Sequence, residues 1–503
     1  MPIWEGFDEL YHYGYVQFVA ASGTFPVAGK TSLSKELWTS LDYAPASHWI
    51  QPYFERPSTS FEEYFRLSEP ERISRRNALD LMPRGLQHDP SPRDNYEAKQ
   101  APLTYLLLAP FERLLADLAV TTRVFVLRLL LSIASFVLVW VGMGKLAVRL
   151  CLAEHMRAAS VFVLFSCQMV YATTCHIAND ALLGPWLLFF LIAQIDFCES
   201  PNLRRAGMAG LWMSTGLLIK SSTLVFVPLV FAAPILQLIR RRSTWWRAAS
   251  LAAVSAGTAI ALAGPWFARN LTLYRNLTAT PETSGLSPGD LFRGAMELPW
   301  RESFSITFHR ALWSGNNTFS SFSAFTIDVA LGVFVLSAVA FVLRTRWNVN
   351  ETLVVASVVL YGVALLGITL AFFVSSGGGA KAPMPWYTEI LLAPVIALSF
   401  LALGRAARMG RWLATFMVLF WAYLAAATWI AKLIPLYGGF GDEHVRPTRL
   451  WSWYLQQSNQ RDSILSTLCP GPVWLIYSML AVVLGTMAVL VCRLCIEMKA
   501  DKP

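Results

Sequence analysis

Charged residues are scarce in this sequence, and that scarcity sets the class of protein. Only 15% of the 503 residues are Asp, Glu, Lys or Arg, whereas 55% are hydrophobic. A soluble chain carries about 25% charged residues. The hydrophobic residues form long runs, each near the ~20 residues that a helix needs to cross a bilayer. This composition excludes an ordinary soluble domain and indicates an all-α integral membrane protein with many transmembrane helices.

Cysteine is also scarce. There are seven cysteines, none in a His/Cys cluster with zinc spacing, and most lie in or beside apolar segments. We therefore expect packing residues and no disulfide framework. The net charge of +9 does not indicate nucleic acid, because the basic residues fall mostly in short loops between apolar runs, as in the cytoplasmic loops of membrane proteins.

About eleven apolar segments are candidates for transmembrane helices. They lie near residues 122–149, 157–175, 181–198, 206–221, 222–239, 248–268, 325–343, 352–374, 387–404, 412–434 and 473–494. The block 206–239 is either two short spans or one broken span. Residues 1–101 contain no span, and the apolar run 100–111 is short and stops at Pro110, which predicts an interfacial or re-entrant segment.

The basic loops give the orientation. If 206–239 is two spans, the basic clusters all fall on one side, which is then cytoplasmic. These clusters contain Lys145, Arg149, Arg157, Arg204, Arg205, Arg240, Arg241, Arg242, Arg247, Arg344, Arg346, Arg405, Arg408, Arg411, Arg493, Lys499 and Lys502. The segment 1–101 and the loops 269–324, 375–387 and 435–472 then face outward.

This orientation divides the chain into four parts. We expect an outward first loop with an acidic motif (1–101), N-terminal transmembrane helices (102–268), an outward loop (269–324), and C-terminal transmembrane helices (325–503) that include the outward loop 435–472. An odd number of spans with a cytoplasmic C-terminus places Met1 outside. Either the first span translocates the N-terminus, or a further helix precedes residue 1. We expect the second, because Asp8 would then follow directly on that helix.

The stretch from Trp4 to Pro26 places acidic groups and a histidine beside the membrane domain. Asp8 and His12 are four residues apart and would share a helix face, with Glu9 between them and Gly23 predicted to end the helix. The alternative is a solvated first turn, in which the helix dipole favours acidic residues whatever the function.

Further polar residues lie at the expected outer ends of spans. His176, Asn179 and Asp180 link the second and third spans, and an acidic residue at a membrane edge is a site candidate, although Asp180 could simply cap the next helix. Lys220, in GLLIKSST, lies at an outward turn between two apolar runs. Its alternative is a snorkelling lysine.

Arg269 ends the sixth span on the outer side, beside Asn270, Tyr274 and Arg275. An outward arginine opposes the positive-inside bias, which indicates a phosphate or carboxylate partner for Arg269. The alternative is an ordinary loop arginine.

Two later loops also contain polar residues. The glycine run 377–379 with Lys381, Trp386, Tyr387 and Glu389 is either a flexible linker or a substrate-gating loop. In the second loop, the consecutive side chains of Asp442, Glu443 and His444 do not converge in a helix or a strand, so we expect a solvated loop rather than a metal site.

Five segments together resemble bacterial polytopic GT-C glycosyltransferases related to the protein O-mannosyltransferases and aminoarabinose transferases. They are GFDELYHYGYVQFVAASGTFPV, YEAKQAPLTYLLLAPF, HIANDALLGPWLL, GLLIKSST and GPWFARNLTLYRNLT, in the family's order and up to about residue 280. The chain departs from the family at Ala101, where proline is usual, at Thr104, where an aromatic is frequent, and in PWYTEILLAP, which lacks the usual Arg-Tyr. By this resemblance, the family's first helix would lie ahead of residue 1.

The resemblance implies an inverting glycosyltransferase of the bacterial inner membrane with its site facing the periplasm. The donor would be a sugar on a polyprenyl phosphate, and the acceptor would be an unidentified hydroxyl. Membrane lipid would surround the protein as a further partner. Asp8 would be the general base, with Glu9 and Asp180 supporting it or holding a divalent metal ion. Arg269 and Lys220 would hold the phosphate, and the substrate-binding residues would be His12, Gln100, Asn179, Asn270 and Tyr274.

Two other classes remain open. In a secondary transporter or lipid flippase, the same charges would bind a substrate without chemistry, although no internal repeat is apparent in the sequence. A lipid-linked polysaccharide ligase or polymerase would keep the membrane donor and change the acceptor.

Overall fold

The chain is helical almost throughout in the computed structural model, which describes residues 1–47, 50–54, 58–279, 286–309, 322–343, 347–440 and 447–500. Within these ranges the strands form a single two-stranded antiparallel sheet, β1 (Ser32–Ser34) with β2 (Pro90–Asp94). The predicted all-α membrane class is confirmed.

Nine helical stretches of the described chain are long and apolar enough to cross a membrane. They are α6 (Val120–Arg149), η4 (Asn179–Leu182) with α9 (Leu183–Glu199), η5 (Ser221–Phe226) with α11 (Val227–Val230) and α12 (Ala232–Ile239), α13 (Trp245–Tyr274), α16 (Ala324–Val342), α17 (Val349–Ser375), η7 (Pro385–Leu391) with α18 (Leu392–Gly404), α19 (Ala407–Ala427) with η8 (Thr428–Leu433) and α20 (Ile434–Tyr437), and α23 (Val473–Ala500).

The remaining two predicted segments are helical but irregular. α7 (Glu154–Ser166) and α8 (Gln168–Thr174) meet at a bend of 59° and make a tenth span if they cross together. α10 (Leu203–Ile219) has only 17 residues, fewer than the ~20 of a straight span. The 206–239 block is therefore two helical segments, separated at Lys220.

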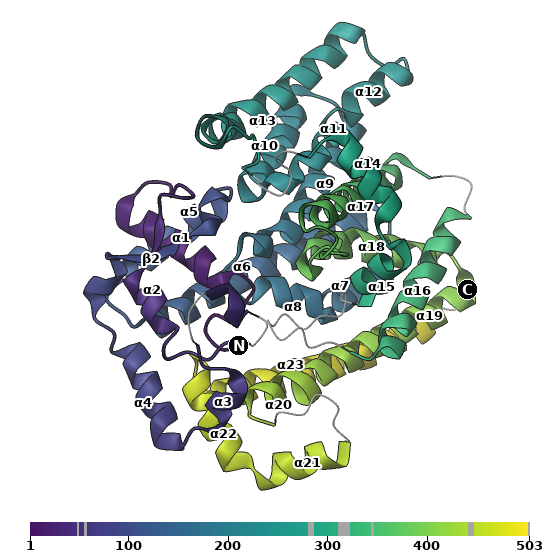
Figure 1. The fold of residues 1–503 in the computed structure, drawn as a ribbon. Coiled ribbons are helices and arrows are strands. Elements are labelled where there is room, and N and C mark those ends of the chain that lie inside the picture. Colours follow the sequence, from purple (N-terminus) through teal and green to yellow (C-terminus); the bar gives the residue numbers. More distant parts are fainter. Residues whose placement is uncertain are drawn as a thin grey trace.

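The shorter helices belong mostly to the segments predicted to face outward. They are α1 (Glu9–Ser22), α2 (Lys35–Ser40), η1 (Gln51–Phe54), α3 (Phe61–Arg66), α4 (Glu69–Asp80), η2 (Arg84–Gln87), η3 (Tyr96–Lys99), α5 (Leu103–Leu114), α14 (Pro288–Glu297), α15 (Trp300–His309), α21 (Pro447–Gln456) and α22 (Ser458–Leu468). Figure 1 shows α1, α2 and α5 grouped beside α6, and α3 and α4 beside α22. Arg76 of α4 joins the second group, donating hydrogen bonds to the Cys469 and Pro470 carbonyls.

α1 is a buried helix rather than a solvated first turn. It begins after Asp8, which has φ 54°, and ends at Gly23, where φ 69° suits glycine. The predicted end at Gly23 is confirmed. Between these residues α1 packs against α5, with the Tyr15 and Tyr105 rings stacked 3.9 Å apart.

α5 covers most of the apolar run 100–111 and continues past Pro110 to Leu114, while the interfacial or re-entrant placement of this segment stays a prediction. Proline removes one backbone hydrogen bond, but side chains in the last turn hold the helix in place. Arg113 donates to the Ala20 carbonyl (2.8 Å), and the buried Glu112 accepts from Tyr13 (2.8 Å) and from Arg123 of α6. These contacts tie α5 to α1 and to the first membrane helix.

Candidate functional site

Two of the predicted site residues meet in a buried ion pair. Lys220 Nζ lies 2.6 and 2.8 Å from the two carboxylate oxygens of Asp180. Lys220 is extended (φ −156°, ψ 131°) at the break between α10 and η5, and Asn179 Nδ2 donates to the Ile219 carbonyl just before it (3.2 Å). The interruption of the helix places the ammonium group at the start of η4 and α9.

Asp8 lies near this pair, at the N-terminus of α1. Its carboxylate interacts electrostatically with Lys220, Asp180 and Lys99, and it accepts a hydrogen bond from the Tyr96 hydroxyl. Burial raises the pKa of Asp8 above its ordinary value, while Tyr96 and Lys220 oppose that rise. Asp8 is therefore a more basic carboxylate than a solvated one, with one oxygen already engaged.

Glu97 is a second carboxyl group beside Asp8, and it was not among the predicted site residues. Burial and the neighbouring charge of Asp8 raise the pKa of Glu97 to about 8. Its Oε2 is 4.0 Å from Nδ1 of His12. At neutral pH this carboxyl group holds its proton and can donate a hydrogen bond.

His12 and Gln100 extend the site between α1 and η4. His12 Nδ1 and the Tyr105 hydroxyl are hydrogen-bonded at 2.8 Å, and burial lowers the pKa of His12 well below its ordinary value, so the ring is neutral. Gln100 Oε1 accepts from Asn179 Nδ2 (3.1 Å), which links the η3 turn to the start of the Asp180 helix. The structure thus brings Asp8, His12, Gln100, Asn179, Asp180 and Lys220 into one polar cluster.

Glu9 occupies a different environment from Asp8. Its carboxylate pairs with Arg128 of α6, with Nε 2.7 Å from Oε1, and it also accepts from the Ile177 backbone N–H (3.0 Å). Burial alone would raise the pKa of Glu9, but Arg128 outweighs it and the pKa is lowered. Glu9 is therefore a charged anchor between α1 and the membrane helices.

Arg269, Asn270 and Tyr274 hold the end of α13 against the segment that follows α1. Arg269 Nη2 donates to the Pro26 carbonyl (2.6 Å), and the Tyr274 hydroxyl accepts from the Ala28 N–H (3.1 Å). Asn270 Nδ2 donates to Leu277 within its own loop. Nη1 of Arg269 is buried with no hydrogen-bond partner in the described structure. Arg269 also interacts electrostatically with Tyr15, whose hydroxyl donates to the Gln100 carbonyl, so this group borders the polar cluster.

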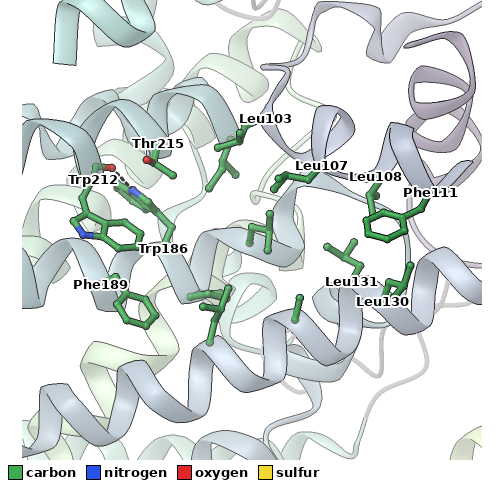
Figure 2. A pocket seen from close by; sticks show the side chains of 15 residues that line it. Leu103, Leu107, Leu108, Phe111, Leu130, Leu131, Trp186, Phe189, Trp212 and Thr215 are labelled. Carbon is green, nitrogen blue, oxygen red and sulfur yellow. Dashed lines mark hydrogen bonds between the residues drawn. The ribbon is translucent and has the colours of Figure 1, made fainter. Parts of the chain in front are cut away.

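An apolar cavity of about 420 Å³ opens between α5, α6, α9 and α10. Figure 2 shows its walls: Leu103, Leu107, Leu108 and Phe111 of α5, Leu130 and Leu131 of α6, Trp186 and Phe189 of α9, and Trp212 and Thr215 of α10. Its other lining residues include Leu182, two residues after Asp180, and Ile219, immediately before Lys220. The cavity itself is not lined by Asp8, Asp180 or Arg269.

The turn η7 covers another side of the cluster. The Tyr387 ring centroid is 4.9 Å from Lys220 Nζ, and Trp386 stacks on Phe7 at 4.1 Å, just before Asp8. Glu389 of the same turn is only 5% exposed. Sequence reasoning named Tyr387 and Glu389 only as parts of a loop, and it missed Tyr96 and Glu97 altogether. The available signal was that Tyr96 and Glu97 are the first two residues of the quoted family segment YEAKQAPLTYLLLAPF.

No group of three His, Cys, Asp or Glu side chains suited to a metal ion occurs in the described parts of the chain. Asp442, Glu443 and His444 lie outside those parts, as do Arg344, Arg346 and Lys502. All seven cysteines are free thiols in the structure.

No protein-family model and no curated protein sequence matches the chain. Among solved structures, it is similar to ArnT from Cupriavidus metallidurans bound to undecaprenyl phosphate, with 14% identity, a TM-score of 0.45, and coverage of 92% of this chain and 73% of that one. It is also similar to the same protein in the apo state, with 14% identity, a TM-score of 0.42, and coverage of 91% and 75%.

Proposed function

We propose that this protein is a membrane glycosyltransferase that moves a sugar from a polyprenyl-phosphate donor to an acceptor hydroxyl on the outer face of the membrane. The observation that carries the proposal is the junction between the apolar cavity and the polar cluster. Leu182 and Ile219 line the cavity, while Asp180 and Lys220, beside them in the chain, belong to the cluster. An isoprenoid tail in the cavity would bring its phosphate to buried cations and its sugar toward Asp8.

The chemical step follows from the charges around Asp8. The acceptor oxygen attacks C1 of the sugar, its proton passes to the Asp8 carboxylate, and the bond from C1 to the phosphate oxygen breaks with inversion. The raised pKa makes Asp8 a stronger base than a solvated aspartate. Lys220 and Arg269 stabilise the departing polyprenyl phosphate, as charge-assisted hydrogen bonds to phosphate are strong.

The other predicted residues support this arrangement in different ways. Asp180 orients the Lys220 ammonium through both of its oxygens. Glu9 supports Asp8 by fixing the adjacent backbone to α6 through Arg128. His12, Gln100 and Asn179 extend the cluster and would contact the substrate, while Asn270 and Tyr274 hold the segment that carries Arg269.

A direct test compares transfer with transport. Purified protein in liposomes is given a polyprenyl-phosphate sugar with and without a hydroxyl acceptor. The proposal expects new product only when the acceptor is present, and none from Asp8→Asn. If no acceptor yields product, while the wild type moves lipid or solute across the bilayer and Asp8→Asn blocks that movement, the protein is a transporter or flippase.

A further inference from the structure

The carboxyl group of Glu389 is a buried part of the site that the transfer reaction above does not use. Glu389 lies in η7, is 5% exposed, and interacts electrostatically with both Asp180 and Lys220. Lys220 already directs its short contacts to the two Asp180 oxygens. Within the described ranges, the Glu389 side chain has no hydrogen bond or ion pair of its own.

Gly184 makes room for this carboxyl group. It lies in the first turn of α9, four residues after Asp180, and a Cβ atom at this position would overlap Glu389 Oε1. Any residue other than glycine would therefore displace the carboxyl group. Two separate elements, α9 and η7, thus place a third carboxyl group beside the Asp180–Lys220 pair.

A buried carboxyl group without a hydrogen-bond partner is costly, so its position needs a reason. A phosphate oxygen only accepts hydrogen bonds, so it leaves the acceptor side of this carboxyl group without a partner. A sugar hydroxyl both donates and accepts, so it can satisfy Glu389 whether or not the carboxyl group carries its proton. If Lys220 holds the leaving phosphate, the sugar attached to that phosphate lies next to Glu389.

We propose that Glu389 is a specificity-determining residue that hydrogen-bonds a hydroxyl group of the transferred sugar, in a space kept open by Gly184. The inference rests on the proposed polyprenyl-phosphate donor. It adds that the protein recognises the sugar part of that donor. A site built to bond a hydroxyl rejects an analogue that lacks it by a large factor, up to about 10⁴ where binding is tightest.

The test measures binding, so it does not depend on transfer. Full-length protein in nanodiscs is titrated with decaprenyl phosphate, and with decaprenyl phosphate carrying glucose, mannose, galactose or arabinose. We expect one glycolipid to bind the wild type at least about tenfold more tightly than the bare lipid. Glu389→Ala should bring the two Kd values together and leave the Kd of bare decaprenyl phosphate unchanged. Gly184→Ala, which displaces the same carboxyl group, should do likewise.

Glu199→Ala is the matched control, because Glu199 is an exposed acid at the opposite end of α9 from the cluster. It should keep the wild-type preference for the glycolipid. The inference is overturned if Glu389→Ala keeps that preference, if it weakens both lipids equally as a structural defect would, or if no glycolipid binds more tightly than the bare lipid to the wild type. Loss of the proposed function alone gives a different result: normal glycolipid binding with no transfer to any acceptor.

Discussion

The charged residues at the two ends of helix α9 differ in how they are paired and how far they are exposed. At the Glu199 end, Arg149 lies 2.6 Å from Asp196 and 3.5 Å from Glu199, and Asn350 donates to Glu199 at 3.0 Å. These four side chains are at or near the surface. Close by, Arg405 lies 2.6 Å from Glu351. Each acid at this end has a basic or amide partner near water.

At the Asp180 end, acids outnumber the cations that pair with them. Asp180 has Lys220, but Asp8, Glu97 and Glu389 have no ion pair with a lysine or arginine in the described structure, and all three lie near Lys220 or Asp180. Paired charges near solvent cost little and hold helices together. Buried acids without a cation cost stability, and such groups gather where a protein binds substrate or moves protons. This contrast supports the proposal that the Asp180 end carries the chemistry, whereas the pairs at the Glu199 end are structural.

Replacing one aspartate at each end should give the largest contrast. Asp8→Asn keeps the shape of the side chain but cannot accept the acceptor's proton, so the rate of sugar transfer should fall about 10²- to 10⁴-fold while the donor still binds. Asp196→Asn, at the Glu199 end, should leave the rate within about twofold of the wild type. Steady-state transfer with a polyprenyl-phosphate sugar measures both. Equal rates for Asp8→Asn and the wild type would remove Asp8 as the base.

Removing Arg269 should weaken the use of the donor. A hydrogen bond to a charged group contributes about 1.5–3 kcal/mol, so Arg269→Ala should raise the KM for the donor about ten- to a hundredfold, with a smaller change for the acceptor. Arg293→Ala removes an exposed arginine from α14 and is the matched control. A donor KM that responds equally to both changes would make Arg269 an ordinary loop arginine.

Much of the fold could be predicted from the sequence because each span is a local property. Hydropathy alone located the apolar segments, and the break between α10 and η5 was visible as the polar Lys220 between two apolar runs. The length of α5 could not be predicted in this way. Pro110 indicates an end, and only contacts from residues distant in sequence, such as Arg113 to Ala20, explain why the helix continues.

The site was harder to predict because its members come from distant parts of the chain. The convergence of Asp8, Asp180 and Lys220 was suggested by their common place at outer span ends and by the family-like segments that contain them. The role of Glu9 could not be separated from that of Asp8, because its partner Arg128 lies 119 residues away inside a span. An arginine within an apolar run is itself a signal of a buried acidic partner, and it could have identified that pair.

Breaking a pair at the Glu199 end should affect stability rather than transfer. Arg405→Ala leaves the side chain of Glu351, 1% exposed, without its ion-pair partner. Because Arg405 itself is 31% exposed, we expect a loss of about 1–3 kcal/mol in the free energy of unfolding, below the full value for a buried pair. Arg408→Ala, an exposed neighbour on α19, should change it by less than about 0.5 kcal/mol. Denaturant unfolding in detergent, followed by circular dichroism, distinguishes the two variants. Equal stability would mean that the Arg405–Glu351 pair contributes nothing.

The last contrast between the two ends appears in how stability depends on pH. The pKa of Glu97 is about 8 in the folded protein and 4.5 as an unperturbed group. Below pH 4.5 the carboxyl group is neutral in both the folded and unfolded states. Between pH 4.5 and 8 the unfolded chain releases this proton and the folded protein keeps it, so rising pH favours unfolding. Glu97→Gln is neutral throughout and should lack this contribution. The difference in Tm between Glu97→Gln and the wild type should therefore grow as pH rises from 4.5 to 8 and then level off. Parallel Tm curves across that range would show that Glu97 ionises at its ordinary pKa, and the Asp180 end would then hold one more charged acid than this structure indicates.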